Sequence, residues 1–318
     1  INGTLSIMKK SLLTFVFLLA LTALNAQTLI KAKFQKGEQA TYSTVSETKI
    51  STPMGGGDQS VKTSSNTVIT VKEANADGYV IELITKDIKT EGDQSTALQT
   101  RNMLSQYLGN VPMRVKTDAN GKVTDILNFE EVQASVSKLV MVFIDSIYKA
   151  KPQLEQGLPK YKMAMSLNNL LTKQTFIETM EHSTFFNLFG KTLKTGDKED
   201  VNQQGIKSIV TYEVTKEPNE LVIIGKTQNN MSEDDVKGFL IDKMKLMGSD
   251  ESMIAKFEQG WLMMKKMGLT KMDGAGTITT RLLPSGWATE YGSSIKSKVM
   301  GAVMTTNSVS KLVEHSWK

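Results

Sequence analysis

The chain has 318 residues and contains no cysteine, 2 histidines and 18 methionines. Without cysteine there is no disulfide framework, thiol nucleophile, cysteine-ligated zinc site or acylated lipoprotein cysteine. The two histidines, His182 and His315, are too few for a multi-histidine metal site, and we expect neither metal nor cofactor. Hydrophobic residues make up 40% and charged residues 22% of the chain, which is typical of a globular protein.

The first elements in the chain resemble an export signal. Met8, Lys9 and Lys10 form a positive start, and residues 11–24 are an almost unbroken apolar run that ends shortly before Ala26. This arrangement is typical of a secretory signal peptide. The run is shorter than the roughly 20 residues that span a bilayer, so a permanent membrane anchor is the less favoured alternative.

We therefore expect residues 1–26 to be an upstream extension and a signal peptide that are removed. Residues 27–318 then form an exported protein, in the periplasm by preference, with secretion or association with the outer membrane as alternatives. Loss of Lys9 and Lys10 lowers the net charge from +5 to +3, which does not indicate a nucleic-acid partner. No later stretch is apolar for long enough to predict a transmembrane span.

Four strand–turn–strand units follow along the chain. Their turns contain Asp77-Gly78, Asn120-Gly121, Asn219 and Gly286, and Asp-Gly and Asn-Gly tolerate the positive φ that tight hairpins need. The flanking segments are rich in Thr, Val, Ile and Tyr, which favour strands. The units pair residues 68–72 with 79–84, 113–116 with 122–126, 209–214 with 221–225, and 277–283 with 287–291.

These units recur in the same order in both halves of the chain, and residues 36–38 resemble residues 195–197. The recurrence suggests an internal duplication, although similar hairpins also arise independently in antiparallel proteins. We expect residues 27–318 to form a single domain with two quasi-repeats, 27–192 and 193–318. The predicted fold class is α+β, with a curved antiparallel sheet built from two related halves and with helices and a helical hairpin packed on one face.

Helices are predicted between the strand units. Asn128 is placed to cap a helix over residues 129–150, and residues 158–188 are expected to be helical in pieces. Ser232, followed by three acidic residues, begins a helix that ends at Gly248. A second helix follows from residue 249 or 250 to Gly268, and the two are expected to form an antiparallel hairpin over one face of the sheet.

Methionine is concentrated on this hairpin, with seven between residues 244 and 272. Core packing explains them most simply, but thioethers also form deformable surfaces for a lipid or partner and bind Cu(I). Copper is disfavoured because no histidine or cysteine accompanies the methionines. Candidate ligand-binding residues are the large apolar side chains that share a helical face, namely Met244, Met247, Phe257, Trp261 and Met264.

No catalytic motif is recognised in the chain. The nucleophile elbow, phosphate loop, dinucleotide fingerprint and zinc-protease motif are all absent, and Gly274-Ala275-Gly276 is interpreted as a loop before a strand. Each histidine lies in a Glu-His-Ser triplet, but adjacent residues point in different directions, so no catalytic residue is assigned. The carboxylate pairs Glu130-Glu131 and Asp234-Asp235 admit acid–base chemistry, although their places at helix starts already explain them.

The junction at residues 25–27, the segment 34–38 followed by Tyr42, and the segment 115–126 together resemble an uncharacterised family of exported Bacteroidota proteins of unknown function. More distantly, the plan is similar to the lipoprotein-carrier half-barrels of the Gram-negative envelope. That resemblance implies a curved sheet that shields an apolar cavity with helices, and it supplies no catalytic residue.

Two kinds of function are therefore expected. The first is a non-enzymatic envelope protein that binds a hydrophobic or lipid-like ligand, or an envelope partner, between the sheet and the hairpin. The alternatives are an exported hydrolase that uses paired carboxylates and a purely structural envelope protein. Exchange of Trp261 for alanine distinguishes a binding site from core packing, because a site loses binding more than stability.

Overall fold

The computed structural model describes residues 27–52, 58–92, 111–203, 205–246, 248–299 and 301–316. The predicted export segment 1–26 lies outside these residues, so its prediction is not tested by the structure. Within the described ranges, no helix is both long enough and apolar enough to cross a membrane.

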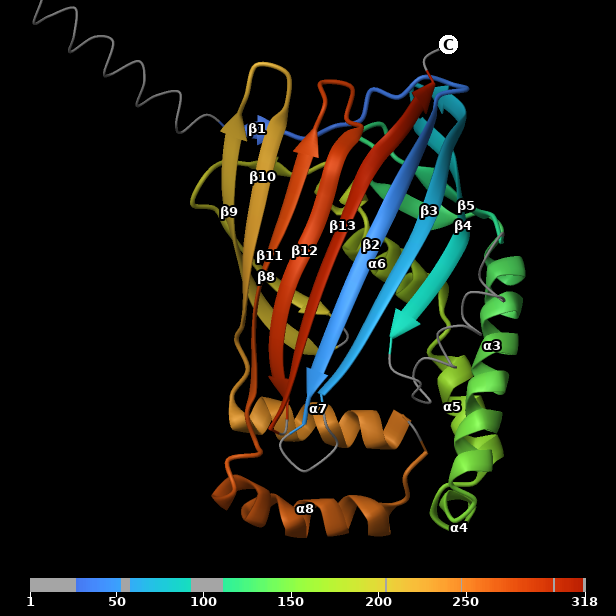
Figure 1. Ribbon diagram of the computed structural model, residues 1–318, viewed down its shortest axis with the longest axis vertical. Helices are drawn as coiled ribbons and strands as arrows, with labels where there is room; N and C mark the ends of the chain where they lie inside the picture. Colours follow the sequence, from blue (N-terminus) through green and yellow to red (C-terminus); the bar gives the residue numbers. More distant parts are fainter. Residues whose placement is uncertain are drawn as a thin grey trace, which may run out of the picture.

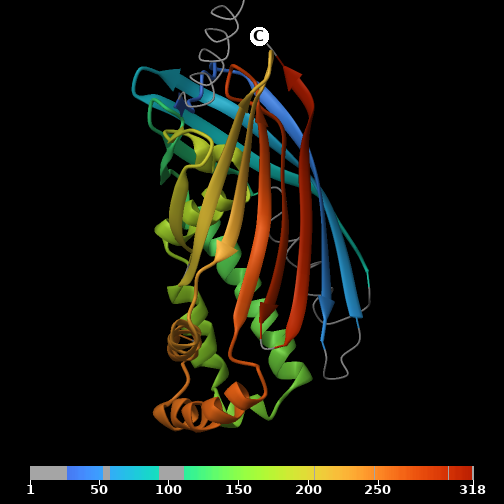
Figure 2. The ribbon, with the colours of Figure 1, turned by 90° about the vertical axis from the view of Figure 1, so that its left-hand side faces the viewer.

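One large antiparallel sheet dominates the fold (Figure 1). Its eleven strands run in the order β6-β5-β4-β3-β2-β13-β12-β11-β10-β9-β8, and the edge strands β6 and β8 do not pair with each other, so the described sheet is not closed. Seen from the side, the strands bend, and the helices lie on one side of them (Figure 2). The predicted α+β class with a curved antiparallel sheet is confirmed.

The sheet is formed by two sets of strands that are contiguous in sequence. The first set is β2 (Gln39–Ser51), β3 (Asp58–Asn75), β4 (Gly78–Gly92), β5 (Met113–Thr117) and β6 (Val123–Ile126). The second set is β8 (Lys198–Gln203), β9 (Ile206–Lys216), β10 (Leu221–Asn229), β11 (Met272–Leu282), β12 (Ala288–Val299) and β13 (Ala302–Ser316). The two sets join where β2 pairs with β13. A second, two-stranded sheet pairs β1 (Thr28–Leu29) with β7 (Thr192–Leu193).

All four predicted hairpins are present, and their strands are longer than predicted except β6, which begins at Val123 rather than at residue 122. The first turn shows why its glycine is needed. Asn75 pairs with Gly78, and Asn75 Oδ1 accepts a hydrogen bond from the amide of Asp77. Gly78 has a φ of 136°, and a Cβ there would lie 2.2 Å from the carbonyl oxygen of Thr117 on β5. Only glycine fits this approach of the turn to the neighbouring strand.

Between the two sets of strands the chain is mostly helical. The elements are α3 (Phe129–Ala150), α4 (Leu154–Gly157), α5 (Lys160–Asn169), α6 (Lys173–Ser183) and the short 3₁₀ helix η1 (Phe185–Leu188). Helix α3 packs against α5, and α6 packs against β6 and η1. Asn128 precedes α3 as predicted but does not cap it, because its Oδ1 instead accepts a hydrogen bond from the amide of Arg114 on β5.

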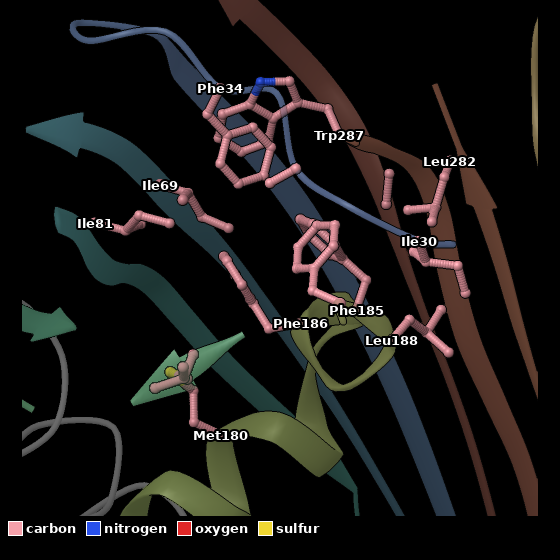
Figure 3. Packing of buried hydrophobic residues seen from close by; sticks show 14 of the residues in the cluster. Ile30, Phe34, Ile69, Ile81, Met180, Phe185, Phe186, Leu188, Leu282 and Trp287 are labelled. Atoms are coloured by element: carbon pink, nitrogen blue, oxygen red, sulfur yellow. The ribbon is translucent and has the colours of Figure 1, made fainter. Parts of the chain in front are cut away.

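The main core lies between one face of the sheet and the segment around η1 (Figure 3). Phe185 and Phe186 stack with their ring centroids 4.9 Å apart, and Phe34 lies 4.3 Å from Trp287. Trp287 and Phe186 are fully buried. Burial of each such side chain contributes roughly 1.5–3 kcal/mol to stability, so this aromatic group fixes η1 against the sheet.

The predicted helical hairpin consists of α7 (Glu233–Leu246) and α8 (Glu251–Lys266). Ser232 and Asp235 form the expected capping arrangement, because the Asp235 amide donates to Ser232 Oγ and the Ser232 amide donates to Asp235 Oδ2. Asp250 caps α8 by accepting a hydrogen bond from the amide of Met253. The hairpin lies on the helical side of the sheet, across the end of the strands (Figures 1 and 2).

Candidate ligand cavity

A cavity of about 810 Å³ lies against the face of the sheet formed by β8–β13. This volume is within the range of small-molecule binding sites in proteins, which is roughly 300–1,000 Å³. One end of the cavity is formed by Leu188, Phe189 and Gly190, which follow from η1. The other end is formed by Met272 and Val299, close to the helical hairpin.

The floor of the cavity follows from the two-residue period of the strands, because alternate side chains point to the same face. Tyr212, Gly225 and Ile278 lie opposite one another on β9, β10 and β11. The next row toward the hairpin contains Thr227, Gly276 and Ile295 on β10, β11 and β12. Other floor residues of the same alternation are Val201, Ser208, Val210, Ile223, Asn229, Gly274, Thr280, Ser297 and Met304.

Glycines on this face leave room for side chains of the adjacent strands to pack directly against the sheet. A Cβ at Gly276 would be 2.9 Å from Ile295 Cγ1, and a Cβ at Gly274 would be 2.7 Å from Asn229 Nδ2. Residues 274–276 are therefore part of β11, and their interpretation as a loop was wrong. Glycine-rich sequence suggested a loop, but here the missing side chains provide room for the cross-strand neighbours.

Two large apolar side chains on the floor are exposed inside the concave face. Ile295 retains 41% and Met304 retains 43% of their accessible surface. Both line the cavity. An inward-facing apolar side chain that the protein leaves uncovered is a surface that gains free energy when an apolar ligand covers it.

Charged residues gather at the η1 end of the cavity. The ammonium of Lys191 donates to both carboxylate oxygens of Glu199, at 2.9 and 2.7 Å, and the hydroxyl of Tyr212 donates to the same carboxylate. Burial, reinforced by the nearby Glu199, raises the pKa of Tyr212 far above its usual value, so the phenol stays protonated. Lys122, Glu181 and Asp200 also line the cavity. The cavity therefore has a charged end and an apolar end.

The hairpin residues predicted to bind a ligand are only partly brought together. Trp261 is buried in a small cluster with Val236 and Met272, and Phe257 and Met264 pack against this cluster. Met244 lies half-buried on α7 and is not part of it, and Met247 lies outside the described residues.

None of the described hairpin candidates lines the cavity itself, but the cluster adjoins the cavity directly. Met272 belongs to both the cluster and the cavity lining, and Ile206 and Val299 line the cavity while packing against the cluster. Trp261 is thus one layer behind the apolar end. A role of the five candidates in ligand binding stays a prediction.

The carboxylate pairs considered for acid–base chemistry do not meet in the cavity. Glu130 and Glu131 lie in the first turn of α3, and Asp234 and Asp235 lie in the first turn of α7, and none of the four is among the lining residues. Among the described residues, no group of three or more His, Asp or Glu side chains is placed to hold a metal ion.

The sequence reasoning missed the residues of the cavity floor. Their signal was present as alternation along β10 and β11, where Ile223, Gly225 and Thr227 face one side and Gly274, Gly276 and Ile278 continue the same pattern. Each strand alone resembles an ordinary half-buried strand. The order of the strands, which the sequence did not provide, is what places these residues side by side.

No family model matches the chain, and no curated protein matches it. Among solved structures, the chain is similar to lipovitellin in a structure that describes lipid–protein interactions, with 11% identity and a TM-score of 0.45 over 89% of this chain and 26% of that chain. This chain therefore spans about a quarter of the lipovitellin chain.

A second similar structure is a protein from Bacteroides fragilis that is described as exported and as having a YmcC-like fold, with 7% identity and a TM-score of 0.27 over 91% of this chain and 100% of that chain. A third is DynF from the dynemicin biosynthesis pathway of Micromonospora chersina, with 7% identity and a TM-score of 0.20 over 90% of this chain and 84% of that chain. At these TM-scores, none of the three carries an argument about function.

Proposed function

We propose that the protein is a non-enzymatic protein of the bacterial envelope that holds an amphipathic, lipid-like ligand in the cavity of its sheet. The observation that carries this proposal is the 810 Å³ cavity with an apolar floor and one charged end. Apolar ligands gain free energy in proportion to the apolar area that they remove from water, at about 25 cal/mol per Å². Exposed Ile295 and Met304 offer such area on the floor.

The distribution of charge supports a ligand with one polar end. Lys191, Glu199 and Tyr212 satisfy one another's hydrogen bonds at the η1 end. Lys122 is exposed beside them and forms no ion pair among the described residues. A polar group placed here stays in contact with charge and water, whereas an apolar chain that extends along β10–β12 reaches Met272 and Val299. This division matches a single-chain amphiphile.

The chemistry of the lining supports binding rather than reaction. The floor is composed mainly of Val, Ile, Met, Gly, Ser and Thr, whose side chains orient an apolar ligand but neither donate nor accept protons readily near neutral pH. The buried phenol of Tyr212 has a raised pKa and stays neutral. Glu199, its carboxylate partner, is engaged by Lys191.

Place in the cell and partners form the second part of the proposal. The predicted signal peptide in residues 1–26 supports export, with the periplasm as the preferred compartment. An exported protein with a cavity for an amphiphile fits transfer or storage of lipid-like molecules between envelope partners. The hairpin candidates Met244, Met247, Phe257, Trp261 and Met264 are proposed as the adaptable wall behind the apolar end of the cavity.

The test introduces a larger side chain at a residue that lines the cavity. Ser297 on β12 lines the cavity and lies opposite Gly274 and Met304. Ser297→Trp is expected to lower the affinity for a fluorescent fatty acid at least about tenfold, because the indole takes up the ligand's volume. The matched control is Lys298→Trp, one residue along and exposed on the opposite face, which is expected to leave affinity unchanged.

Native mass spectrometry and organic extraction of residues 27–318, purified from the periplasm, identify a ligand that copurifies. These residues contain every helix and strand that the structure describes. A wild-type protein that carries no extractable amphiphile and does not bind the fluorescent fatty acid contradicts the proposal. Equal affinity of the Ser297→Trp and Lys298→Trp variants places the ligand elsewhere.

A further inference from the structure

Helix α8 presents an apolar face to solvent that the fold does not use. Leu262 is 70% exposed, Met263 is 68% exposed, and Met267, directly after the helix, is 51% exposed. The buried face of the helix is the one with Trp261, which packs toward Val236 of α7. Leu262, Met263 and Met267 are thus exposed to solvent on a helix that lies beyond α7 at this end of the molecule (Figure 1).

Eight of the exposed residues at α8 lie on one side of the helix. Residues three, four and seven apart in a helix share a face, and positions 252, 255, 256, 259, 262, 263, 266 and 267 follow this spacing. All eight are exposed. The stripe, hereafter the outer stripe, is composed of Ser252, Ala255, Lys256, Gln259, Leu262, Met263, Lys266 and Met267.

The outer stripe is basic as well as apolar. It contains Lys256 and Lys266, and the exposed Glu251 and Glu258 lie along its edge, Glu258 being four residues before Leu262. Neither lysine forms an ion pair within the described parts of the chain. Glu258 pairs with Lys237 at 3.1 Å, and Glu233 pairs with Lys265 at 2.6 Å. Lys256 and Lys266, which form no ion pair among the described residues, thus flank three exposed apolar side chains.

We propose that the outer stripe of α8 docks the protein onto the surface of an anionic phospholipid bilayer. A helix that lies in the interface buries its apolar side chains at the boundary of the acyl chains, while lysines contact anionic headgroups. Leu262, Met263 and Met267 supply the apolar contacts, and Lys256 and Lys266 supply the charge. The long, flexible methionine and lysine side chains suit a fluid surface, which offers no fixed pockets.

Docking in this orientation is useful for the proposed ligand binding but is independent of it. The opposite face of α8 belongs to the cluster of Trp261 and Met272, and Met272 lines the apolar end of the cavity. A docked α8 therefore holds the apolar end of the cavity near the bilayer.

The test is cosedimentation of residues 27–318 with vesicles of phosphatidylcholine and phosphatidylglycerol, compared with vesicles of phosphatidylcholine alone. We expect binding to the anionic vesicles only, and loss of binding at high salt. Leu262→Ser combined with Met263→Ser is expected to lower the partition coefficient at least about tenfold through lost apolar burial. Lys256→Gln combined with Lys266→Gln is expected to lower it about tenfold through lost attraction to the anionic surface.

The matched control is Val309→Ser combined with Val313→Ser, which removes two exposed apolar side chains from β13 and is expected to leave vesicle binding unchanged. Fluorescent fatty-acid binding, measured without vesicles, should be the same in all variants, so failure of docking and failure of the cavity are distinguishable. Equal binding to both kinds of vesicle, no binding to either, or unchanged binding of the Leu262/Met263 variant overturns the proposal. A change of molecular mass in that variant without a change in vesicle binding assigns the stripe to a second copy of the chain instead.

Discussion

The indole Nε1 of Trp287 donates a hydrogen bond to the carboxylate of Glu38 at 3.0 Å, across 249 residues of sequence. Both side chains are buried. The same oxygen of Glu38 accepts a hydrogen bond from the amide of Gln35 at 2.9 Å. A buried carboxylate therefore joins the turn that begins the first set of strands to the start of β12 in the second set.

Replacement of Glu38 by alanine is expected to lower the free energy of unfolding by roughly 2–4 kcal/mol, because two donors inside the protein lose their acceptor. Chemical denaturation followed by circular dichroism measures this change. Glu47→Ala is the matched control, because the side chain of Glu47 is 40% exposed and forms an ion pair with exposed Lys49. Its expected effect is within about 0.5 kcal/mol, and equal effects of the two substitutions would contradict the structural role of Glu38.

The turn around Glu38 has a counterpart in the second half of the chain. The amide of Gly37 donates to the carbonyl oxygen of Val71, and the amide of Gly196 donates to that of Tyr212. Each glycine has a similar positive φ, 88° and 93°. Asp197 repeats the second contact of Glu38, because its carboxylate accepts a hydrogen bond from the amide of Lys194, three residues before it. This shared geometry supports the quasi-repeats 27–192 and 193–318 that we propose from the sequence.

Local signals predicted much of the fold. Turns with Asp-Gly and Asn-Gly located the hairpins, and the apolar spacing and Pro152 gave the bounds of α3 as the structure has them. The apolar spacing of α3 predicts an inward stripe of Val132, Val136, Leu139, Val140, Phe143 and Ile147. Of these only Val132 and Leu139 are buried, and Ile144 and Tyr148 are buried in addition, where α3 packs against α5. The length of β3 and the strand β13 were missed, since Ser and Thr dominate parts of them and leave no clear apolar alternation.

The candidate site was less predictable than the fold. The concentration of methionine between residues 244 and 272 pointed to the hairpin cluster around Trp261, which is compact and local in sequence. The cavity floor draws Tyr212, Gly225, Ile278 and Ile295 from four strands, and only the pairing of those strands reveals it. A site that depends on strand order is not encoded in any single window of sequence.

A glycine of the cavity floor and a glycine of α8 give predictions of opposite sign. Gly276→Ala is expected to destabilise the protein by about 1–3 kcal/mol, because the new Cβ lies within 2.9 Å of Ile295 Cγ1 and forces that side chain to move. Gly260→Ala, inside α8 with no atom within 4 Å of the new Cβ, is expected to stabilise it by about 0.5–1 kcal/mol through helix propensity. Thermal unfolding of both variants tests this, and destabilisation by Gly260→Ala or none by Gly276→Ala contradicts it.

Low pH is expected to destabilise the N-terminal turn of α7. The ammonium of Lys207, together with hydrogen bonds from Ser232, holds the pKa of Asp235 well below its usual value. A carboxyl group whose pKa is lowered by folding stabilises the folded state above its unfolded pKa, near pH 4, and this contribution is lost as the pH falls further.

Hydrogen exchange of the α7 amides, followed by mass spectrometry, is therefore expected to accelerate below about pH 4 relative to the amides of β3, after correction for the intrinsic pH dependence of exchange. Asp235→Asn is expected to remove this additional acid dependence. Asp234→Asn leaves the contacts of Ser232 and Lys207 with Asp235 in place and is expected to preserve it. An unchanged acid response in the Asp235 variant would show that the cap does not control the helix start.

Substitution of Trp261 distinguishes a role in the wall of the cavity from a role in core packing alone. Its cluster with Val236 and Met272 is distinct from the main core around Trp287. Trp261→Ala is therefore expected to open the hairpin locally, and to weaken retention of a fluorescent fatty acid more than it lowers the free energy of global unfolding, because Met272 loses the side chain that supports it behind the cavity. Fluorescent titration and denaturant unfolding of the same variant give the affinity and the free energy of unfolding.

Leu262→Ala, at the adjacent and exposed residue, is the control and is expected to change neither quantity. Equal losses of binding and of stability in the Trp261 variant would instead assign this side chain to the packing of the hairpin alone.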